Sequence, residues 1–577
     1  MQGKSGMQSL KNNKPAALLI IIGSLVWSLT MVKSGLCWDA KCVGGIGFWG
    51  PNGHDGVWHI ALINHLANDS LEMPVFSGSD LKNYHIGFDL LLSLFVRFFH
   101  IPAQTLYFQI IPPIVAVLIG FLTYLFVERW TKSKKGAFWA TFFVYFGGSF
   151  GPIVSLIRDG HIGGESTFWS QQAISTLINP PFALSLVALL VILLILLKYE
   201  EKKTWKKFAV LVLLIAITTQ IKVYAGILTI SALLAVGLYD LVLKKNTSYL
   251  ALATTSLVIS LLLFIPLNKN SSSLVVFQPF WFLETMMALS DRLGWPRYYE
   301  AMTNYKAGGN FVKGVPAYIV AFIIFWAGNM GTRIVAGTEN FRWIKSWNKL
   351  SPIKVFMVVL TTEALTAPML FLQKGTPWNT IQFFYYYLFF ASIIAGIAFE
   401  NLIKDKSHQV RNILVCALLV LTLPTTYATL QHYLPSRPPA RLPNDEIEAL
   451  KFLSKNERGV VLTYPFDSYA AEQAVVNPPR PLYLYESTAY VAAFSGKPTF
   501  LEDEINLNIT DYEWRARRKE VEEWLKNLDQ KETYAFLRKN NIKYVYWVKG
   551  QRASLGETQL GISRIFENKS VDIYQVD

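Results

Sequence analysis

The run FALSLVALLVILLILL (182–197) contains no charged residue. Two further runs, KPAALLIIIGSLVWSLTMV (14–32) and SYLALATTSLVISLLLFIPL (248–267), approach the ~20 residues that cross the hydrocarbon core of a bilayer. Only 16% of the 577 residues are charged, whereas soluble domains contain about a quarter, and the mean hydropathy is +0.30. The sequence therefore predicts an α-helical polytopic membrane protein.

Apolar stretches with charged ends predict about eleven transmembrane helices. We expect them near residues 15–32, 105–127, 136–157, 177–197, 207–221, 224–243, 248–267, 314–335, 351–372, 380–400 and 411–430.

The distribution of Lys and Arg predicts the orientation. Short basic turns alternate with longer, less basic loops; these turns are 128–135, 198–207, 243–246, 339–349 and 404–411. By the positive-inside rule the N-terminus is cytoplasmic, and an odd number of spans places the C-terminal tail outside the cytoplasm. A cleavable signal peptide is the alternative for residues 1–36, but no A-x-A-like site follows. We expect a multi-pass protein of a prokaryotic plasma membrane.

The net charge of +14 lies mostly in these turns, so topology explains it and we expect no nucleic acid partner. Cys37 and Cys42, in CWDAKC, are either free thiols or a local disulfide, which an oxidising compartment would favour. Cys416, within an apolar segment, is expected to serve packing.

The predicted domains are a transmembrane domain, 1–430, and an extracytoplasmic tail, 431–577. The tail opens with the Pro-rich LPSRPPARLP (434–443), and helical spacing follows in 444–456. Strands are predicted at 459–465, 542–548 and 571–576, the second of them after a helix. The tail is therefore expected to be a small α/β domain with its own core.

The first external loop, 33–104, contains FWGPNGHDGVWHIALINHLAND (48–69). Asp55 lies there between His54 and His59, at or just before the start of a helix that is expected to lie on the membrane surface. Its simplest interpretation is a helix N-cap, for which Asp is a preferred residue. The loop continues through MPVFSGSDLKNYHIGFDLLLSLFVRFFHIP (73–102), with Tyr84 and His85 ahead of a second amphipathic helix.

This arrangement resembles the GT-C superfamily of integral-membrane glycosyltransferases, of the protein-mannosyltransferase or aminoarabinose-transferase kind. In that superfamily an acidic motif follows the first span, two helices lie along the membrane, and the chain often ends in an external domain. GHDGVWH (53–59) stands where many members carry two adjacent acidic residues, and it has only one.

The resemblance implies an inverting hexosyl- or pentosyltransferase of the cell envelope. Its donor would be a polyprenyl-phosphate sugar at the lipid bilayer, and its acceptor a glycan, lipid or protein. Asp55 would act as general base toward an acceptor hydroxyl, and the lipid phosphate leaves without a protonating acid. His54 or His59 would orient Asp55, bind acceptor or ligate a metal, unless they are simply structural.

A second acidic group is sought in RDGHIGGEST (158–167), from which related metal-dependent enzymes draw one. Glu165 or Asp159 would then join Asp55, with Mg²⁺ or Mn²⁺ between Asp55 and Glu165 as an open possibility. A solvated loop is the alternative interpretation.

Two further motifs suggest contacts to the donor. TQIKVYAGIL (219–228) places Lys222 and Tyr224 at a hairpin turn where superfamily members often have Lys, an aromatic residue and Gly. FLQKGTPWNTIQFFYYYLFF (371–390) adds Lys374, Asn379 and Gln382 before an aromatic run. A snorkelling lysine and an interfacial aromatic belt are the respective alternatives.

Glu363 falls in the middle of a predicted span, where a charge is costly and is a functional hint by default. It would line a donor cavity or hydrogen-bond a neighbouring helix, and it favours the main competing function, a lipid-linked sugar flippase or transporter. A glycan polymerase and a membrane anchor for the tail are further alternatives.

Overall fold

The computed structural model describes residues 13–268, 275–475, 477–527, 529–553, 555 and 562–577. Contacts divide the chain into two compact units. The first comprises Met1–Thr30, Pro113–Pro266 and Asn270–Tyr433, and the second Met31–Pro112, Leu267–Lys269 and Leu434–Asp577. Each unit thus draws on segments far apart in the sequence.

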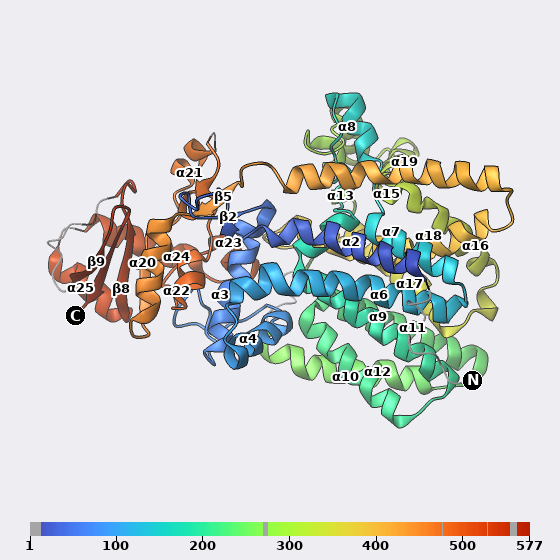
Figure 1. Cartoon of the computed structure of the whole chain (residues 1–577), viewed down its shortest axis with the longest axis horizontal. Helices are drawn as coiled ribbons and strands as arrows, with labels where there is room; N and C mark the ends of the chain where they lie inside the picture. The colour runs from blue at the N-terminus through green and yellow to red at the C-terminus, as the bar shows by residue number, and fades with distance from the viewer. Residues whose placement is uncertain (1–12, 269–274, 476, 528, 554, 556–561) are drawn as a thin grey trace. The chain divides into compact units, whose positions relative to one another are not determined.

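The first unit is built of long helices, many of which run lengthwise in one bundle (Figure 1). Its helices are α2 (Lys14–Val32), α6 (Ile111–Thr131), α7 (Lys134–Phe146), α8 (Gly151–Asp159), α9 (Pro180–Glu201), α10 (Trp205–Ile221), α11 (Val223–Lys244), α12 (Ser248–Phe264), α13 (Trp281–Ala288), α14 (Pro296–Ala307), α15 (Phe311–Met330), α16 (Ala336–Lys345), α17 (Pro352–Leu370), α18 (Gln382–Ile403) and α19 (His408–Tyr433). Shorter 3-10 turns are η3 (Ala173–Ile178), η6 (Gly331–Val335) and η8 (Pro377–Ile381), and the antiparallel strands are β3 (Val275–Phe277) and β4 (Phe371–Gln373).

Each of the eleven predicted spans coincides with helical structure. Among the described residues, nine helices are long and apolar enough to cross a membrane. A tenth span forms if α7 and α8, bent by 40° at a short break, count as one. The remaining predicted span, 207–221, is α10, which has 17 residues. The chain is therefore a multi-pass α-helical membrane protein, and its described residues contain nine or ten helices of spanning length beside the shorter α10.

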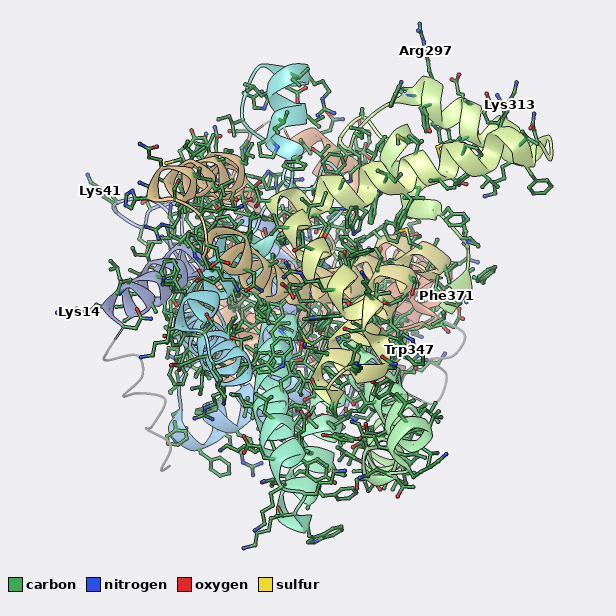
Figure 2. The ribbon with its side chains drawn as sticks, turned by 90° about the vertical axis from the view of Figure 1, so that its right-hand side faces the viewer. Lys14, Lys41, Arg297, Lys313, Trp347 and Phe371 are labelled. Atoms are coloured by element: carbon green, nitrogen blue, oxygen red, sulfur yellow. A yellow bond between two sulfur atoms is a disulfide. The ribbon has the colours of Figure 1, made fainter. Side chains whose placement is uncertain are left out.

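Small residues allow close helix packing in this unit. A Cβ on Gly396 of α18 would lie 2.1 Å from the backbone nitrogen of Ala140 on α7, so only glycine permits this approach. The Tyr145 ring on α7 fills the space beside Gly23 on α2 and Gly120 on α6. Figure 2 shows Arg297 and Lys313, on α14 and α15, pointing away from the bundle.

The second unit combines the first external loop with the tail. From the loop come β1 (Leu36–Cys37), β2 (Ile46–Phe48), η1 (Gly50–Gly53), α3 (Asp55–Ala67), α4 (Gly87–Phe99), α5 (Ala103–Thr105) and the π-turn η2 (Leu106–Ile110). From the tail come β5 (Ala440–Leu442), α20 (Asn444–Lys455), β6 (Val460–Thr463), α21 (Ser468–Ala474), β7 (Arg480–Pro481), η9 (Leu482–Leu484), α22 (Tyr490–Ser495), α23 (Glu504–Ile509), α24 (Trp514–Lys526), α25 (Gln530–Lys539), β8 (Ile542–Val548), β9 (Ile562–Glu567) and β10 (Val571–Val576).

Two four-stranded sheets organise this unit. One has the order β6-β8-β10-β9, with β6 parallel to β8 and the other pairs antiparallel. Strands β8 and β10 match the predicted residues, and β6 lies within its predicted range. The other sheet has the order β1-β2-β5-β7, so loop strand β2 pairs with tail strand β5.

The predicted transmembrane domain, 1–430, includes loop 33–104, whereas the contacts group this loop with the tail. Backbone hydrogen bonds run from Thr499 to Pro74, from Ser77 to Thr499 and from Glu502 to Val75. The loop's strands are two or three residues long, too short for a stable sheet alone, so they are completed by tail strands.

Three local expectations have definite outcomes. Cys37 and Cys42 form a disulfide. Cys416 is a free, exposed cysteine on α19, so the expectation that it packs inside is wrong. Helix α3 does not present one face to a membrane surface: most of it, from Gly56 to Leu66, is buried against α4 and α22, because both faces carry apolar side chains.

Candidate functional site

Asp55 is the first residue of α3. The preceding residue, His54, occupies the N-cap position but makes no side-chain capping bond, so Asp55 is not the N-cap that its simplest interpretation predicted. The glycines around it allow close packing: a Cβ on Gly56 would lie 2.6 Å from the Phe108 ring, and one on Gly53 2.9 Å from Ala440. A carboxylate at a helix N-terminus also interacts favourably with the helix dipole.

His54 bridges two carboxylates that lie far apart in the sequence. Its Nδ1 is 2.9 Å from Oδ1 of Asp55, and its Nε2 is 3.2 Å from Oδ1 of Asp503. The side chain of Asp55 is 55% exposed, whereas those of His54 and Asp503 are 8% and 0% exposed. The cluster therefore offers one solvent-accessible carboxylate, that of Asp55, which is held by the buried pair of His54 and Asp503.

The charge on His54 follows from this geometry. Burial disfavours the imidazolium, but Asp503 and Asp55 outweigh it and hold the pKa of His54 well above its ordinary value. A protonated imidazole donates from both nitrogens, which matches the two carboxylate contacts.

Asp503 is itself held in place by its own helix. It precedes α23 with a left-handed backbone (φ 49°), and its Oδ1 accepts the Asn506 backbone N–H at 3.0 Å. Its Oδ2 accepts from the Asn506 side-chain amide at 2.8 Å. An Asx N-cap of this kind was readable in LEDEINLN (501–508), but its pairing with His54 was not.

Glu486 is a further acidic group of the same cluster. Burial raises its pKa, nearby Asp55 and Asp503 add to that rise, and His54 and Arg480 oppose it. The second acidic residue was predicted in 158–167. Asp503 and Glu486 come from the tail, more than 430 residues later in the chain, and no local pattern links them to Asp55.

His59 belongs to a separate buried pair. Its Nδ1 lies 2.7 Å from Oδ1 of Asp89 on α4, and its ring stacks on Tyr107. Tyr84 packs edge-on against Trp58 and stacks on His85. It is half-buried, and desolvation of its hydroxyl raises its pKa well above the ordinary value. These contacts place His59 in the core around α3, with the half-buried Tyr84 and His85 beside it.

The predicted residues of loop 158–167 belong to the first unit. Asp159, the last residue of α8, pairs with neighbouring Arg158 at 2.8 Å. Glu165 is only 8% exposed and accepts from the Gln172 backbone N–H at 2.8 Å and from the Ser175 hydroxyl at 2.5 Å. Burial raises the pKa of Glu165 to about 7. Glu165 is thus a satisfied interior acid rather than part of a solvated loop.

A metal site requires several His, Cys, Asp or Glu side chains close together. Within the described residues, no three His, Cys, Asp or Glu side chains form a cluster suited to a metal ion. A divalent cation bound by Asp55 or Glu165 stays a prediction.

The two predicted donor motifs meet in the first unit. The hydroxyl of Tyr224 donates to the side-chain oxygen of Gln373 at 3.3 Å, and Asn379 donates to the same oxygen at 2.6 Å. Gln382 in turn donates to Asn379 and accepts from Asn179 at 3.3 Å, so the chain of amides crosses from α18 to α9.

The two lysines of these motifs differ in exposure. Lys222, at the N-cap of α11, is 5% exposed, with its ammonium 5.6 Å from the Tyr224 ring centre. It does not snorkel outward. Lys374, in the β4–η8 turn, is exposed.

No protein-family model and no curated protein matches this chain. Among solved structures it is similar to the Archaeoglobus fulgidus oligosaccharyltransferase tethered to an acceptor peptide, with 13% identity and a TM-score of 0.49. It is also similar to the archaeal oligosaccharyltransferase AglB from Archaeoglobus fulgidus in complex with an inhibitory peptide and a dolichol-phosphate, with 13% identity and a TM-score of 0.48.

Both matches cover 92% of this chain and 69% of the other.

Proposed function

We propose that this protein is a membrane glycosyltransferase of the GT-C kind. It transfers a hexose or pentose from a polyprenyl-phosphate donor to an acceptor hydroxyl outside the cytoplasm. The observation that carries the proposal is the Asp55–His54–Asp503 cluster, in which one carboxylate is open to solvent and the other two groups are buried.

In this mechanism Asp55 is the general base. The acceptor oxygen attacks the anomeric carbon, the bond from that carbon to the phosphate oxygen breaks, and the polyprenyl phosphate leaves with the bonding electrons. Asp55 accepts the hydroxyl proton, and the configuration at the anomeric carbon inverts. The protonated His54 stabilises negative charge on Asp55 and, because Asp503 holds its other nitrogen, keeps the carboxylate oriented.

The leaving phosphate needs positive charge or hydrogen-bond donors rather than an acid. Lys222 and Lys374, the basic residues of the two predicted donor motifs, both belong to the first unit, as does the amide chain through Gln373, Asn379 and Gln382. The N-terminus is cytoplasmic and the tail extracytoplasmic, as the basic turns suggest.

Glu363 does not require a second function. The hydroxyl of Ser231 on α11 donates to its carboxyl group on α17, and this interhelical contact accounts for a polar residue in a span. We therefore propose no flippase activity.

The test uses the purified full chain in nanodiscs with a panel of radiolabelled polyprenyl-phosphate sugars, with and without Mg²⁺ or Mn²⁺. Asp55→Asn should lower the transfer rate at least ~100-fold, as expected for loss of a general base. Asp69→Asn is the matched control: Asp69 is an exposed carboxylate beyond the other end of α3, and this change should leave the rate unaltered. A full rate in Asp55→Asn would remove Asp55 from the mechanism.

A further inference from the structure

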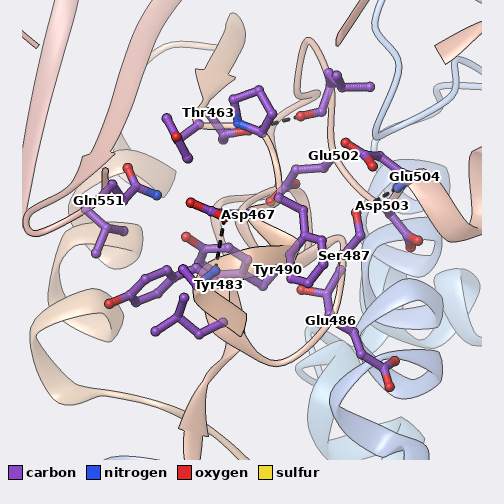
Figure 3. Close-up of a pocket in the computed structure, with 18 of the residues that line it drawn as sticks. Thr463, Asp467, Tyr483, Glu486, Ser487, Tyr490, Glu502, Asp503, Glu504 and Gln551 are labelled. Atoms are coloured by element: carbon purple, nitrogen blue, oxygen red, sulfur yellow. Dashed lines mark hydrogen bonds between the residues drawn. The ribbon is translucent and has the colours of Figure 1, made fainter. Parts of the chain in front are cut away.

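The second unit contains a pocket of about 120 Å³ (Figure 3). Residues that follow β6, from Tyr464 to Asp467, form one wall, and residues that follow β8, from Gly550 to Arg552, form another. The carboxyl ends of adjacent parallel strands are where α/β sheets commonly bind ligands. At ~10–15 Å³ for each water-sized volume, the pocket accepts on the order of ten non-hydrogen atoms.

Many acidic groups line this pocket, yet most of them are neutralised within the protein. Asp467 forms two hydrogen bonds with Arg552, and Asp503 contacts the imidazolium of His54. Glu504 is paired with Arg518 at 2.5 Å. A pocket with such balanced charge offers many hydrogen-bonding groups without strongly favouring a cation.

The two remaining carboxyl groups of the pocket wall, Glu486 and Glu502, have pKa values raised by burial, that of Glu502 to about 8. Near neutral pH, Glu502 therefore adds little net negative charge to the pocket.

Two polar atoms in the pocket wall lack a hydrogen-bond partner among the described residues. They are the hydroxyl of Thr488, a residue that is 4% exposed, and the side-chain oxygen of Gln551. A buried polar atom without a partner is costly, so such atoms commonly indicate an absent ligand or water. Aromatic rings of Tyr483 and Tyr490 line the same space and offer flat apolar faces.

We propose that this pocket binds one ring of a neutral carbohydrate. The hydroxyl groups of a sugar would satisfy the Thr488 and Gln551 oxygens, and its apolar face would pack on a tyrosine. Asp503 lines the pocket and also bonds His54, so the bound sugar lies next to the cluster that contains Asp55. That this sugar is part of the acceptor rests on the proposed function; the binding itself does not.

The pocket is tested by direct binding to the full chain in nanodiscs. The probes are soluble tetrasaccharides of glucose, mannose and N-acetylglucosamine, with tetralysine as the cationic alternative, followed by saturation-transfer NMR. We expect saturable binding of at least one tetrasaccharide and none of tetralysine. Binding of no tetrasaccharide, or displacement of the sugar by tetralysine, would overturn the proposal.

Thr488→Val separates a ligand role from a structural one. Because the hydroxyl has no partner in the fold, its loss should leave Tm unchanged or higher, while the Kd for the sugar rises about fivefold to tenfold. Thr533→Val is the matched control: that buried hydroxyl donates to Gln530 on α25, so its loss should lower Tm and leave Kd unchanged. An unchanged Kd in Thr488→Val would contradict the assignment.

Asp55→Asn distinguishes the two proposals. Asp55 is not among the residues that line the pocket, so this variant should bind the sugar normally even where transfer is lost. Intact sugar binding together with undiminished transfer in Asp55→Asn would reject the mechanism and keep the binding site.

Discussion

At the scale of single residues, the cluster around His54 combines an exposed carboxylate, Asp55, with an imidazole whose orientation is fixed by two hydrogen bonds. Asp55 is half exposed, while the imidazole behind it is enclosed and contacts carboxylates on both nitrogens. Asp55 and His54 were predicted as candidates from their position after the first predicted span. Spacing could not predict Asp503, because it lies 449 positions from His54 and the two residues meet only where the chain enters α3 and α23.

Asp503→Asn should weaken the contact that holds His54 in this cluster. The amide leaves His54 without its buried counter-charge, and losing one partner of a buried charged hydrogen bond costs ~1–3 kcal/mol. We expect a lower Tm of the second unit and a reduced transfer rate, measured by thermal unfolding in nanodiscs and by the donor assay. A variant with wild-type Tm and rate would show that Asp503 does not position His54.

The protonation of His54 predicts a pH dependence. Its folded pKa lies above the value of 6.5 in the unfolded chain, so its stabilising contribution is complete below pH 6.5. This contribution is lost as the pH rises through the folded pKa. Tm measured across pH should therefore fall more steeply at alkaline pH for the wild type than for His54→Gln.

The wild type and His54→Gln share every other titrating group, so the variant serves as the control for them. The pKa values of the buried acids Glu446 and Glu502 are raised to about 7 and about 8, so both destabilise the fold as they ionise with rising pH. Both proteins share this background, and only the difference between the two curves reports His54. Parallel curves would contradict a raised pKa for His54.

At the scale of elements, the β2–β5 pairing joins loop to tail. Gly45, just before β2, has a φ of +86°, and a Cβ there would lie 2.0 Å from the Leu442 carbonyl oxygen. The turn therefore depends on glycine for its backbone conformation and also for space.

Gly45→Ala should lower the free energy of unfolding by more than the ~1–3 kcal/mol of backbone strain alone, because the clash with β5 adds to it. Gly78→Ala is the matched control: its φ is +81° in the same loop, but a Cβ there meets nothing within 4 Å. Thermal unfolding of both variants checks this, and equal losses would argue against the close contact at β5.

At the scale of the whole molecule, the second unit is assembled from both ends of the chain. The segment Met31–Pro112, which contains loop 33–104, contributes α3, and the tail contributes α22, which packs against α3. Part of the core around Asp55 is therefore encoded beyond residue 434.

Deleting residues 434–577 should unfold the loop while preserving the helices of the first unit. β2 loses its partner β5, and α3 loses the apolar cover of α22. We expect rapid cleavage within 33–104 in limited proteolysis of the truncated chain, with the helical circular dichroism of the spans retained. A loop as resistant as in the full chain would show that it folds without the tail.

The sequence by itself determined the membrane class, the positions of the spans and the strands β8 and β10, because apolar length and periodicity are local properties. It also singled out Asp55 from its neighbours in the chain. Only the tertiary structure decided that the loop and the tail form one unit, that His54 joins Asp55 to Asp503, and that Tyr224 meets Gln373 and Asn379. These contacts depend on long-range burial and backbone pairing, which no short window of the chain contains.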